Sequence, residues 1–238
     1  MPELVIDRLV HVYGSHGVRA VDGVSLRIGA GERVALIGQN GSGKTTLARH
    51  LNGLLRPTEG SVTLDGTDAA RLTVAQLASR VGLVFQDPDR QIFAGSVRAE
   101  VEFGPRNLGR SGAALRDAVA TALDATGLTA EERTNPYDLG GSRRKLLALA
   151  SVLAMRTPVL VLDEPTTGQD ARGVERVRAV VDAVAAEGRT VIAISHDMRF
   201  VAETFERVVV MRAGRVAAVL DRAAADERTV MMHATGTA

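Results

Sequence analysis

The residues from Gly38 to Thr45 have the types and spacing needed to bind phosphate. They read G-Q-N-G-S-G-K-T and match the phosphate-loop pattern G-x-x-x-x-G-K-[ST]. The glycines allow backbone N–H groups to point at phosphate oxygens, and a following helix directs its positive end at the same oxygens. Lys44 then contacts the β/γ-phosphates and Thr45 offers a hydroxyl to Mg²⁺. We expect these residues to bind the phosphates: Gly38, Gln39, Asn40, Gly41, Ser42, Gly43, Lys44, Thr45 and Thr46.

Two acidic residues follow a second apolar run, Val159–Leu162. Ligands bind at the carboxyl ends of the strands in parallel α/β sheets, so Asp163 and Glu164 are expected beside the phosphates. Asp163 would hold Mg²⁺ and Glu164 would polarise the attacking water. The alternative is that the two acids only cap a helix, a role that also suits Asp and Glu.

The elements that must position these residues are short apolar runs alternating with helical segments. This pattern predicts a parallel sheet covered by helices on both faces. The expected strands are Leu4–Val10, Val18–Ile28, Glu32–Gly38, Ser61–Leu64, Val81–Phe85, Pro158–Leu162, Thr190–Ser195, Arg207–Met211 and Val216–Leu220, with turns at Gly14–Gly17 and Ala213–Gly214. The expected helices are Lys44–Leu54, Ser111–Gly127, Ser142–Met155, Asp170–Glu187 and Asp197–Phe205. The segment after Asp221 has little pattern, and we expect it to be frayed.

Composition narrows the class of protein. The 238 residues carry 29 basic and 28 acidic side chains, a balance that argues against a dedicated nucleic-acid binder. The absence of cysteine excludes disulfides, thiol catalysis and Cys-ligated zinc. The longest apolar stretch, Leu146–Met155, is too short to span a bilayer, and Met1–Val10 lacks the basic start of a signal peptide. Only Lys44 and Lys145 are lysines, which hints that these two positions need a lysine.

An ordered set of motifs gives the chain a family resemblance. An aromatic residue, the phosphate loop, a glutamine, a signature-like segment, the acidic strand end and a histidine follow one another as in the ATP-binding subunits of ABC transporters. The resemblance spans about residues 3–220. It implies an α/β fold of the P-loop NTPase class, an ABC-type ATPase core. That core has a mostly parallel sheet, an N-terminal antiparallel β subdomain and an inserted helical subdomain.

The same resemblance implies one ABC ATPase domain over residues 1–238, and an enzyme that hydrolyses ATP with Mg²⁺. The RecA-like and β core would comprise about residues 1–86 and 157–220, the helical signature subdomain about 87–156, and the C-terminal tail 221–238.

Residue roles are carried over position by position. Tyr13 resembles the aromatic residue that stacks on adenine, and Gln86 resembles the glutamine that touches Mg²⁺ and senses the membrane partner. His196 resembles the histidine that contacts the γ-phosphate, and Asp170 in TTGQD resembles an aspartate at the interface of the ATPase dimer. The remaining histidines match no motif, and we expect them at the surface or in local packing: His11, His16, His50 and His233.

The segment after Gln86 resembles the energy-coupling-factor (ECF) group of ABC ATPases. The similarity lies in QDPDRQIF, residues 86–93, and VEFGPRNLG, residues 101–109. It implies uptake of a vitamin or a transition-metal ion, with a transmembrane component, a separate substrate-binding membrane component and a second ATPase subunit. A conventional ABC importer or exporter subunit is the alternative, and only this segment separates the two.

The signature motif departs from the family pattern. Where the family has L-S-G-G-Q, this chain has Leu139-Gly140-Gly141-Ser142-Arg143. In the family this loop caps the γ-phosphate bound to the other subunit. The backbone N–H groups of Gly140, Gly141 and Ser142 can still bind that phosphate, but the family's serine hydroxyl is missing, and Ser142 is shifted in position. Since the residues for the chain's own nucleotide are intact, a heterodimer with one weakened site is favoured over a homodimer.

The remaining alternatives come from other classes. A soluble ABC protein acting on nucleic acid or ribosomes usually has tandem ATPase domains or a coiled-coil insertion, and this chain shows one phosphate loop and no heptads. A metabolite kinase would not explain the signature-like helix or His196. The resemblance therefore implies a peripheral protein at the cytoplasmic face of the membrane, with no nucleic-acid partner.

Overall fold

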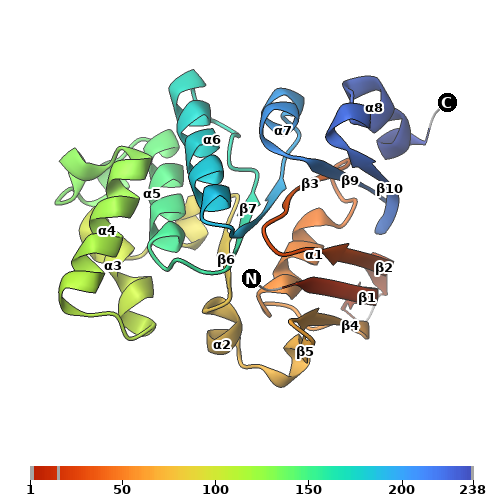
Figure 1. Cartoon of the computed structure of the whole chain (residues 1–238), viewed down its shortest axis with the longest axis horizontal. Coiled ribbons are helices and arrows are strands. Elements are labelled where there is room, and N and C mark those ends of the chain that lie inside the picture. Colours follow the sequence, from red (N-terminus) through yellow and green to blue (C-terminus); the bar gives the residue numbers. More distant parts are fainter. Residues whose placement is uncertain (1–2, 15–16, 237–238) are drawn as a thin grey trace.

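Two β-sheets and the helices around them make up the computed structural model, which describes residues 3–14 and 17–236. In Figure 1 the larger sheet crosses the middle of the molecule, with the smaller sheet at the lower right and a group of helices at the left. His16 and the centre of the expected turn Gly14–Gly17 lie outside the described residues.

The smaller sheet is antiparallel and has the order β2-β1-β4-β5. Alternate side chains of β2, such as Val24, Leu26 and Ile28, are buried, as expected for a sheet with one covered face. Its strands are β1 (Leu4–Tyr13), β2 (Val18–Ile28), β4 (Glu59–Leu64) and β5 (Thr67–Asp68).

The larger sheet has the order β10-β9-β3-β8-β7-β6 and is parallel except for the β9–β10 hairpin. Every residue of β6, β7 and β8 is buried, which explains their continuous apolar runs. The hairpin turns at Ala213 and Gly214, both of which have positive φ. Its strands are β3 (Arg33–Ile37), β6 (Val81–Val84), β7 (Val159–Asp163), β8 (Thr190–Ile194), β9 (Arg207–Arg212) and β10 (Arg215–Asp221).

Helices cover both faces of the larger sheet. Helix α1 (Lys44–Leu51) buries Leu47 and Leu51 in a core shared with the smaller sheet, so α1 lies between the two sheets. The second core joins the other face to α6 (Ala171–Ala186), α7 (Met198–Thr204) and the helical layer α3 (Val97–Asn107), α4 (Gly112–Thr126) and α5 (Gly141–Leu153). The remaining helices are α2 (Val74–Ala78), α8 (Glu227–Thr235) and short 3₁₀ turns at Ala69–Arg71, Pro88–Arg90, Thr129–Glu131, Pro136–Asp138 and Arg222–Ala224.

The predicted α/β architecture is confirmed, and the strands lie close to their expected bounds. The expectation of a frayed tail is wrong. After Asp221 the chain forms α8, because Asp226 caps its first turn through Thr229 and Val230 and Ala234 bury its inner face. Helices α2 and α3 and the short strand β5 were not predicted as separate elements.

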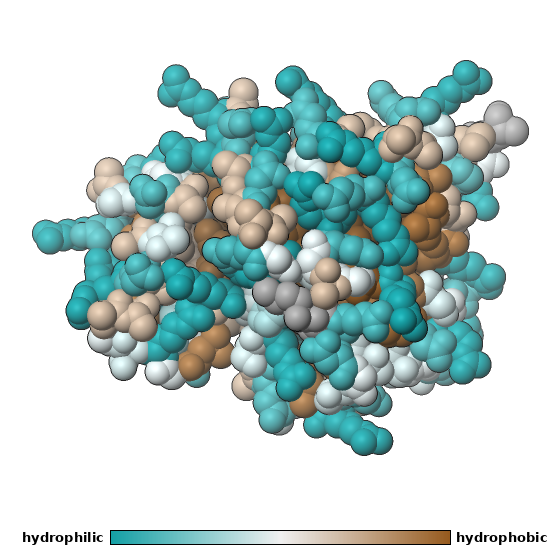
Figure 2. Space-filling model, in the orientation of Figure 1, coloured by the Kyte–Doolittle hydropathy of each residue, from teal (hydrophilic) through white to brown (hydrophobic). Residues whose placement is uncertain are grey.

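The exposed side chains are mostly polar. In Figure 2 hydrophilic side chains cover most of the displayed face, and apolar ones show in the seams between elements. Over residues 3–14 and 17–236, no helix combines the length and the apolar character that crossing a bilayer requires.

Candidate functional site

The phosphate loop joins β3 to α1 in a conformation that requires glycine at two positions. Gly43 has φ 100°, and a Cβ there would lie 2.4 Å from the carbonyl oxygen of Ala20. A Cβ on Gly38 would lie 2.1 Å from the carbonyl oxygen of Met211. Such contacts exclude a larger residue, so the tight loop and the start of α1 at Lys44 depend on these glycines.

The ammonium group of Lys44 lies inside this loop. Nζ donates to the carbonyl oxygens of Gly38 at 2.7 Å and Gln39 at 3.0 Å, and it is 3.5 Å from Ser42 Oγ. Burial lowers the pKa of Lys44, and the carboxylates of Glu164 and Asp163 act in the opposite direction. The side chain is therefore a nearly buried cation held at the loop, as phosphate binding needs.

Asp163 ends β7 directly beside α1. Thr45 Oγ1 donates to Asp163 Oδ2 at 2.9 Å. The other oxygen, Oδ1, is buried and has no hydrogen-bond partner among the described residues. Burial raises the pKa of Asp163, and the hydrogen bond from Thr45 opposes that change. Asp163 lies in a strand, so the alternative in which it caps a helix does not apply to it.

The chemistry of these two groups fits Mg²⁺. A hydroxyl oxygen and a buried carboxylate oxygen without a partner are hard ligands of the kind that Mg²⁺ prefers. Within residues 3–14 and 17–236, no cluster of three or more His, Cys, Asp or Glu side chains could hold a metal alone. The site therefore suits an ion that shares its ligands with substrate phosphates and water.

Glu164 follows with an unusual backbone and a well-defined carboxylate. Its φ is 52°, a left-handed conformation that costs a non-glycine residue about 1–3 kcal/mol. Its N–H donates to the carbonyl of Ile194 in β8 at 2.9 Å. Nδ1 of His196 donates to Glu164 Oε2 at 2.8 Å, and Thr167 Oγ1 donates to the same oxygen at 3.3 Å. The carboxylate is thus oriented by two donors beside the phosphate loop.

A cavity of about 440 Å³ opens over the phosphate loop. It brings together the loop, the acidic pair and the glutamine expected from sequence, and it adds residues from β2 and β8. Its lining is Val18, Arg19, Ala20, Asn40, Gly41, Gly43, Lys44, Thr45, Thr46, Gln86, Asp163, Glu164 and Ile194. Val18, Arg19 and Ala20 carry no motif, so sequence reasoning missed them.

A second cavity of about 460 Å³ lies on the other side of the loop. Gln86 and Glu164 line both cavities, and His196 lines the second one only. Its outer wall is α8, including Glu227, Val230 and Met231. The exposed side chain of His196 therefore stands between the phosphate loop and the C-terminal helix.

Tyr13 lies next to the first cavity but does not line it. Its hydroxyl oxygen is 3.4 Å from Thr46 Oγ1, and its ring meets His11 edge-on at 4.5 Å between centroids. His11 and His50 are both buried, and His11 Nδ1 lies 3.1 Å from His50 Nε2. The two histidines are packed in the interior beneath Tyr13, so a surface position is excluded for both.

The polar side chains of the altered signature segment bond to other residues of the same chain. Ser142 Oγ donates to Gln169 Oε1 at 2.6 Å, and Arg143 contacts Glu131 and donates to the carbonyl of Gly127 at 2.8 Å. Asp170 caps α6 by accepting from the N–H of Gly173 at 2.7 Å. The signature positions Gly140, Gly141 and Ser142, together with Asp170, lie outside the lining of both cavities beside the phosphate loop.

Comparisons with known proteins agree on one family. The family model described as "ABC transporter" matches residues 21–167. Four curated relatives named as putative ABC transporter ATP-binding proteins are 38% to 45% identical to this chain; they come from Methanosarcina mazei, Methanosarcina acetivorans and Caldanaerobacter subterraneus. The chain spans 35% to 43% of the length of these four relatives.

Three further matches cover more of the known protein. The energy-coupling factor transporter ATP-binding protein EcfA of Methanothermobacter thermautotrophicus is 40% identical over 85% of this chain and 66% of that protein. The structure of cbiO1 from Clostridium perfringens, part of the ABC transporter complex cbiONQ, is 33% identical with a TM-score of 0.83, over 98% of this chain and 94% of that one. A dimeric ATP-binding cassette in a post-hydrolysis state, bound to ADP and Pi, is 25% identical with a TM-score of 0.83, over 92% and 98%.

Proposed function

The chain belongs to the ABC transporter family and contains its ATP-hydrolysing domain, and from this premise we propose that it powers an ECF-type transporter. In this proposal it drives the uptake of a vitamin or a transition-metal ion through a separate membrane component. The observation that carries the proposal is that Lys44, the Thr45–Asp163 pair and the Glu164–His196 pair meet at the carboxyl ends of adjacent strands.

The phosphate loop binds the nucleotide. Backbone N–H groups of the loop and of the first turn of α1 contact the phosphates, and Lys44 compensates the charge of the β/γ-phosphates. Tyr13 stacks on the adenine beside Thr46, and an edge-on contact with His11 holds its ring in place. The nucleotide phosphates fill the cavity that Lys44 and Thr45 line.

Thr45, Asp163 and Gln86 are the residues that would hold Mg²⁺. When bound, the ion neutralises charge on the phosphate oxygens. The chain's own contribution is the hydrogen bond from the Thr45 hydroxyl, which orients Asp163 and opposes the rise in its pKa that burial causes.

Glu164 is the general base. Its carboxylate takes a proton from the attacking water, and His196 fixes that carboxylate by donating from Nδ1 while its exposed ring reaches the γ-phosphate. Because both side chains are placed by the ends of β7 and β8, the two elements set the distance between base and phosphate.

The partners follow from the ECF resemblance and from the altered signature. The proposed complex contains a second ABC ATPase, a transmembrane component and a separate substrate-binding membrane component. It places this chain at the cytoplasmic face of the membrane. A partner with a standard signature would complete the nucleotide site on this chain, so a heterodimer is favoured over a homodimer. The relation to EcfA and to a CbiO component of a cbiONQ complex supports this assembly.

The test is a tagged pull-down from detergent-solubilised membranes, with partners identified by mass spectrometry. The proposal expects a multi-span membrane protein and a second ATPase with an intact signature. Recovery of ribosomes, nucleic acid or only this chain would leave the ATPase domain in place and overturn the transport function.

A further inference from the structure

The altered signature helix is fastened to the loop that carries Glu164. Ser142 Oγ donates to Gln169 Oε1 at 2.6 Å, and Gln169 Nε2 donates back to the carbonyl oxygen of Ser142 at 3.0 Å. Both side chains are half-buried, and α5 and the loop after Glu164 are joined by two opposed hydrogen bonds. Ser142, which replaces a glycine of the family signature, therefore already uses its hydroxyl and its carbonyl oxygen in hydrogen bonds within its own chain.

A second contact joins the same two segments closer to the carboxylate. Nζ of Lys145, one turn further along α5, donates to the carbonyl oxygen of Thr167 at 2.6 Å. The hydroxyl of Thr167 donates in turn to Glu164 Oε2 at 3.3 Å. Hydrogen bonds through Thr167 thus connect the signature helix to the carboxylate that His196 also contacts.

Gly173 provides the space for the glutamine. A Cβ at Gly173 would lie 2.1 Å from Gln169 Oε1 and 3.1 Å from Gln169 Cβ. Gly173 lies in the first turn of α6 and is buried, so the glutamine side chain occupies the place that an alanine methyl group would take. The contact between α5 and this loop therefore depends on three residues: Ser142, Gln169 and Gly173.

From these contacts we propose that Ser142, Gln169 and Lys145 are positioning residues that hold Glu164 for water activation in this same chain. The proposal rests on the function proposed above, and it gives the altered signature a role in cis. None of the three touches the nucleotide cavity, so each acts through the loop from Glu164 to Asp170.

The backbone of Glu164 needs such support, and Lys145 is suited to give it. Glu164 has φ 52°, and a strained non-glycine residue keeps its conformation only when its surroundings fix it. Lys145 donates a charge-assisted hydrogen bond, which is about twice as strong as a neutral one. Burial lowers the pKa of Lys145 while Glu164, Asp87 and Asp163 act against that change, so the cation is held among carboxylates.

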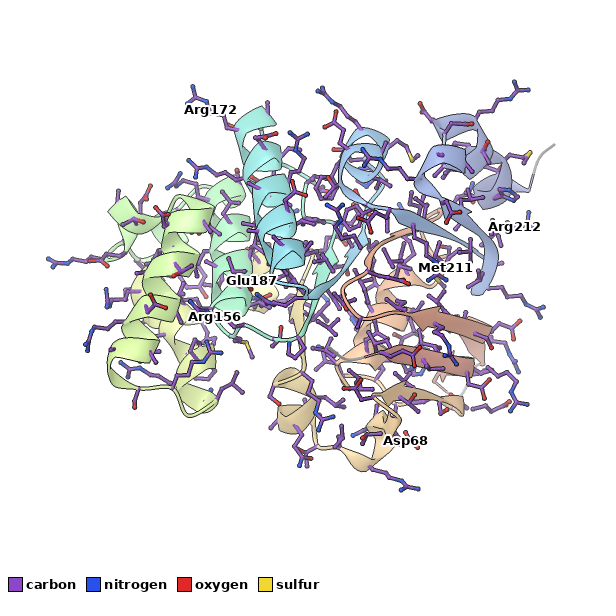
Figure 3. The ribbon with its side chains drawn as sticks, viewed as in Figure 1. Asp68, Arg156, Arg172, Glu187, Met211 and Arg212 are labelled. Carbon is purple, nitrogen blue, oxygen red and sulfur yellow. The ribbon has the colours of Figure 1, made fainter. Side chains whose placement is uncertain are left out.

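The experiment uses four variants of the full chain, co-purified with its ATPase and membrane partners. Gln169→Leu removes the amide, and Gly173→Ala displaces it while favouring the helix by about 1 kcal/mol, as glycine and alanine propensities predict. Lys145→Met removes the cation, and Lys145→Arg restores one. The control is Arg172→Ala, because Arg172 is exposed and extends outward from the first turn of α6 (Figure 3).

Three quantities are measured for each variant, and the melting temperature is recorded beside them as a check on folding. They are kcat for ATP hydrolysis, the Kd for ATP in EDTA, and deuterium exchange of the amides of residues 166–170. We expect kcat to be lowered about threefold to tenfold in three variants. Gln169→Leu removes both hydrogen bonds to Ser142, Gly173→Ala displaces the amide that makes them, and Lys145→Met removes the donor to Thr167. We expect Kd within about twofold, since the phosphate loop is untouched, and faster exchange in residues 166–170. Lys145→Arg should recover most of the lost kcat, and Arg172→Ala should match the wild type in all three quantities.

The outcomes separate this inference from the function on which it rests. A wild-type complex that neither binds nor hydrolyses ATP overturns the proposed function. A functional wild type with unchanged kcat and exchange in Gln169→Leu and Gly173→Ala overturns the positioning role. A loss of kcat that follows a lowered melting temperature in Gly173→Ala shows a general folding defect and also overturns it.

Discussion

Nδ1 of His196 lies 2.8 Å from Oε2 of Glu164, although the histidine side chain is 71% exposed and the glutamate side chain is 11% exposed. The pair therefore connects a buried carboxylate with an accessible ring. In the proposed function, Glu164 acts on water inside the site and His196 meets the phosphate at its surface.

Substituting Glu164→Gln should keep ATP binding and lower hydrolysis by about 100-fold or more, within the range typical of a lost general base. The amide has the shape of the carboxylate but cannot accept the water proton. ATPase turnover and nucleotide Kd are measured together, with Glu175→Gln, an exposed glutamate of α6, as the matched control. Unchanged turnover in Glu164→Gln would remove the assignment of the base.

Substituting His196→Ala should lower kcat and leave the Kd for ATP nearly unchanged, because the histidine orients Glu164 and contributes little to phosphate-loop binding. A double-mutant cycle with Glu164→Gln checks this. If the two side chains act as one unit, the double variant is hardly slower than Glu164→Gln alone. Losses that multiply would show that the histidine acts independently.

Substituting Lys44→Ala should weaken ATP binding about 100-fold, since a nearly buried cation against the phosphates is lost. The reason is electrostatic, so Arg71→Ala, at an exposed position on a 3₁₀ turn, serves as the control of equal charge change. Titration with a fluorescent ATP analogue measures both. Equal affinities in the two variants would contradict the phosphate-loop assignment.

Substituting Asp163→Asn should raise the stability of the fold without ligand and remove the added stabilisation by Mg²⁺. Burial raises the pKa of Asp163, so its ionisation is less favourable in the folded state than in the unfolded chain. That group stabilises the fold fully only below its unfolded pKa, and the stability is lost as pH rises through the folded pKa.

At pH 7.5 Asp163→Asn should therefore raise the melting temperature without ligand, by about 2–4 °C if roughly 1 kcal/mol is regained. The additional stabilisation by ATP with Mg²⁺ over ATP in EDTA should disappear. Thermal melts of both proteins without ligand, with ATP and Mg²⁺, and with ATP in EDTA test both parts. A variant that keeps the Mg²⁺-dependent increase would contradict the proposed role of Asp163.

Acid should weaken the fold through the buried histidine pair. Burial lowers the pKa of His50 below its usual 6.5, helped by the neighbouring His11 and opposed by hydrogen bonds to backbone carbonyls. The unfolded chain therefore takes up a proton that the folded chain refuses. The stability contributed is present above about pH 6.5 and is lost as pH falls toward the folded pKa, by at most about 1.4 kcal/mol per pH unit.

The measurement for this pair is the melting temperature between pH 7.5 and 5.5. His50→Gln, whose amide can still donate to the carbonyl of Thr46, should show a shallower decrease over this range than the wild type. Parallel curves for the two proteins would show that other groups cause the acid sensitivity.

The sequence was sufficient for those parts of the fold whose physics is local. The phosphate loop, the buried strands Val159–Asp163 and Thr190–Ile194, and the close of α4 at Gly127 all follow from short patterns. Helix α8 was missed, although its cap residues are visible in the sequence as Asp226 at its start and Gly236 after its end. Its inner face has few apolar residues, so a search for long apolar periodicity passed over it.

The contacts that position the site could not be predicted because they join residues far apart in the chain. His11 meets His50 across 39 residues only because β1 and α1 pack together. Ser142 meets Gln169 across 27 residues because α5 begins beside the loop after β7. Single-sequence patterns describe which face a side chain occupies, and they carry no information about which distant side chain it will meet.

The order of the larger sheet has a consequence for how the protein is made. Strands β3 and β6 leave the ribosome first, yet β8 and β7 lie between them in the finished sheet. Thr45 lies 118 residues before its hydrogen-bond partner Asp163. A nascent chain that has produced only the phosphate loop thus lacks its acidic partner, and the middle of the sheet is completed only when later strands are inserted between earlier ones. Such non-local pairing slows folding. Each molecule therefore has its helical layer synthesised before it can bind and hydrolyse nucleotide.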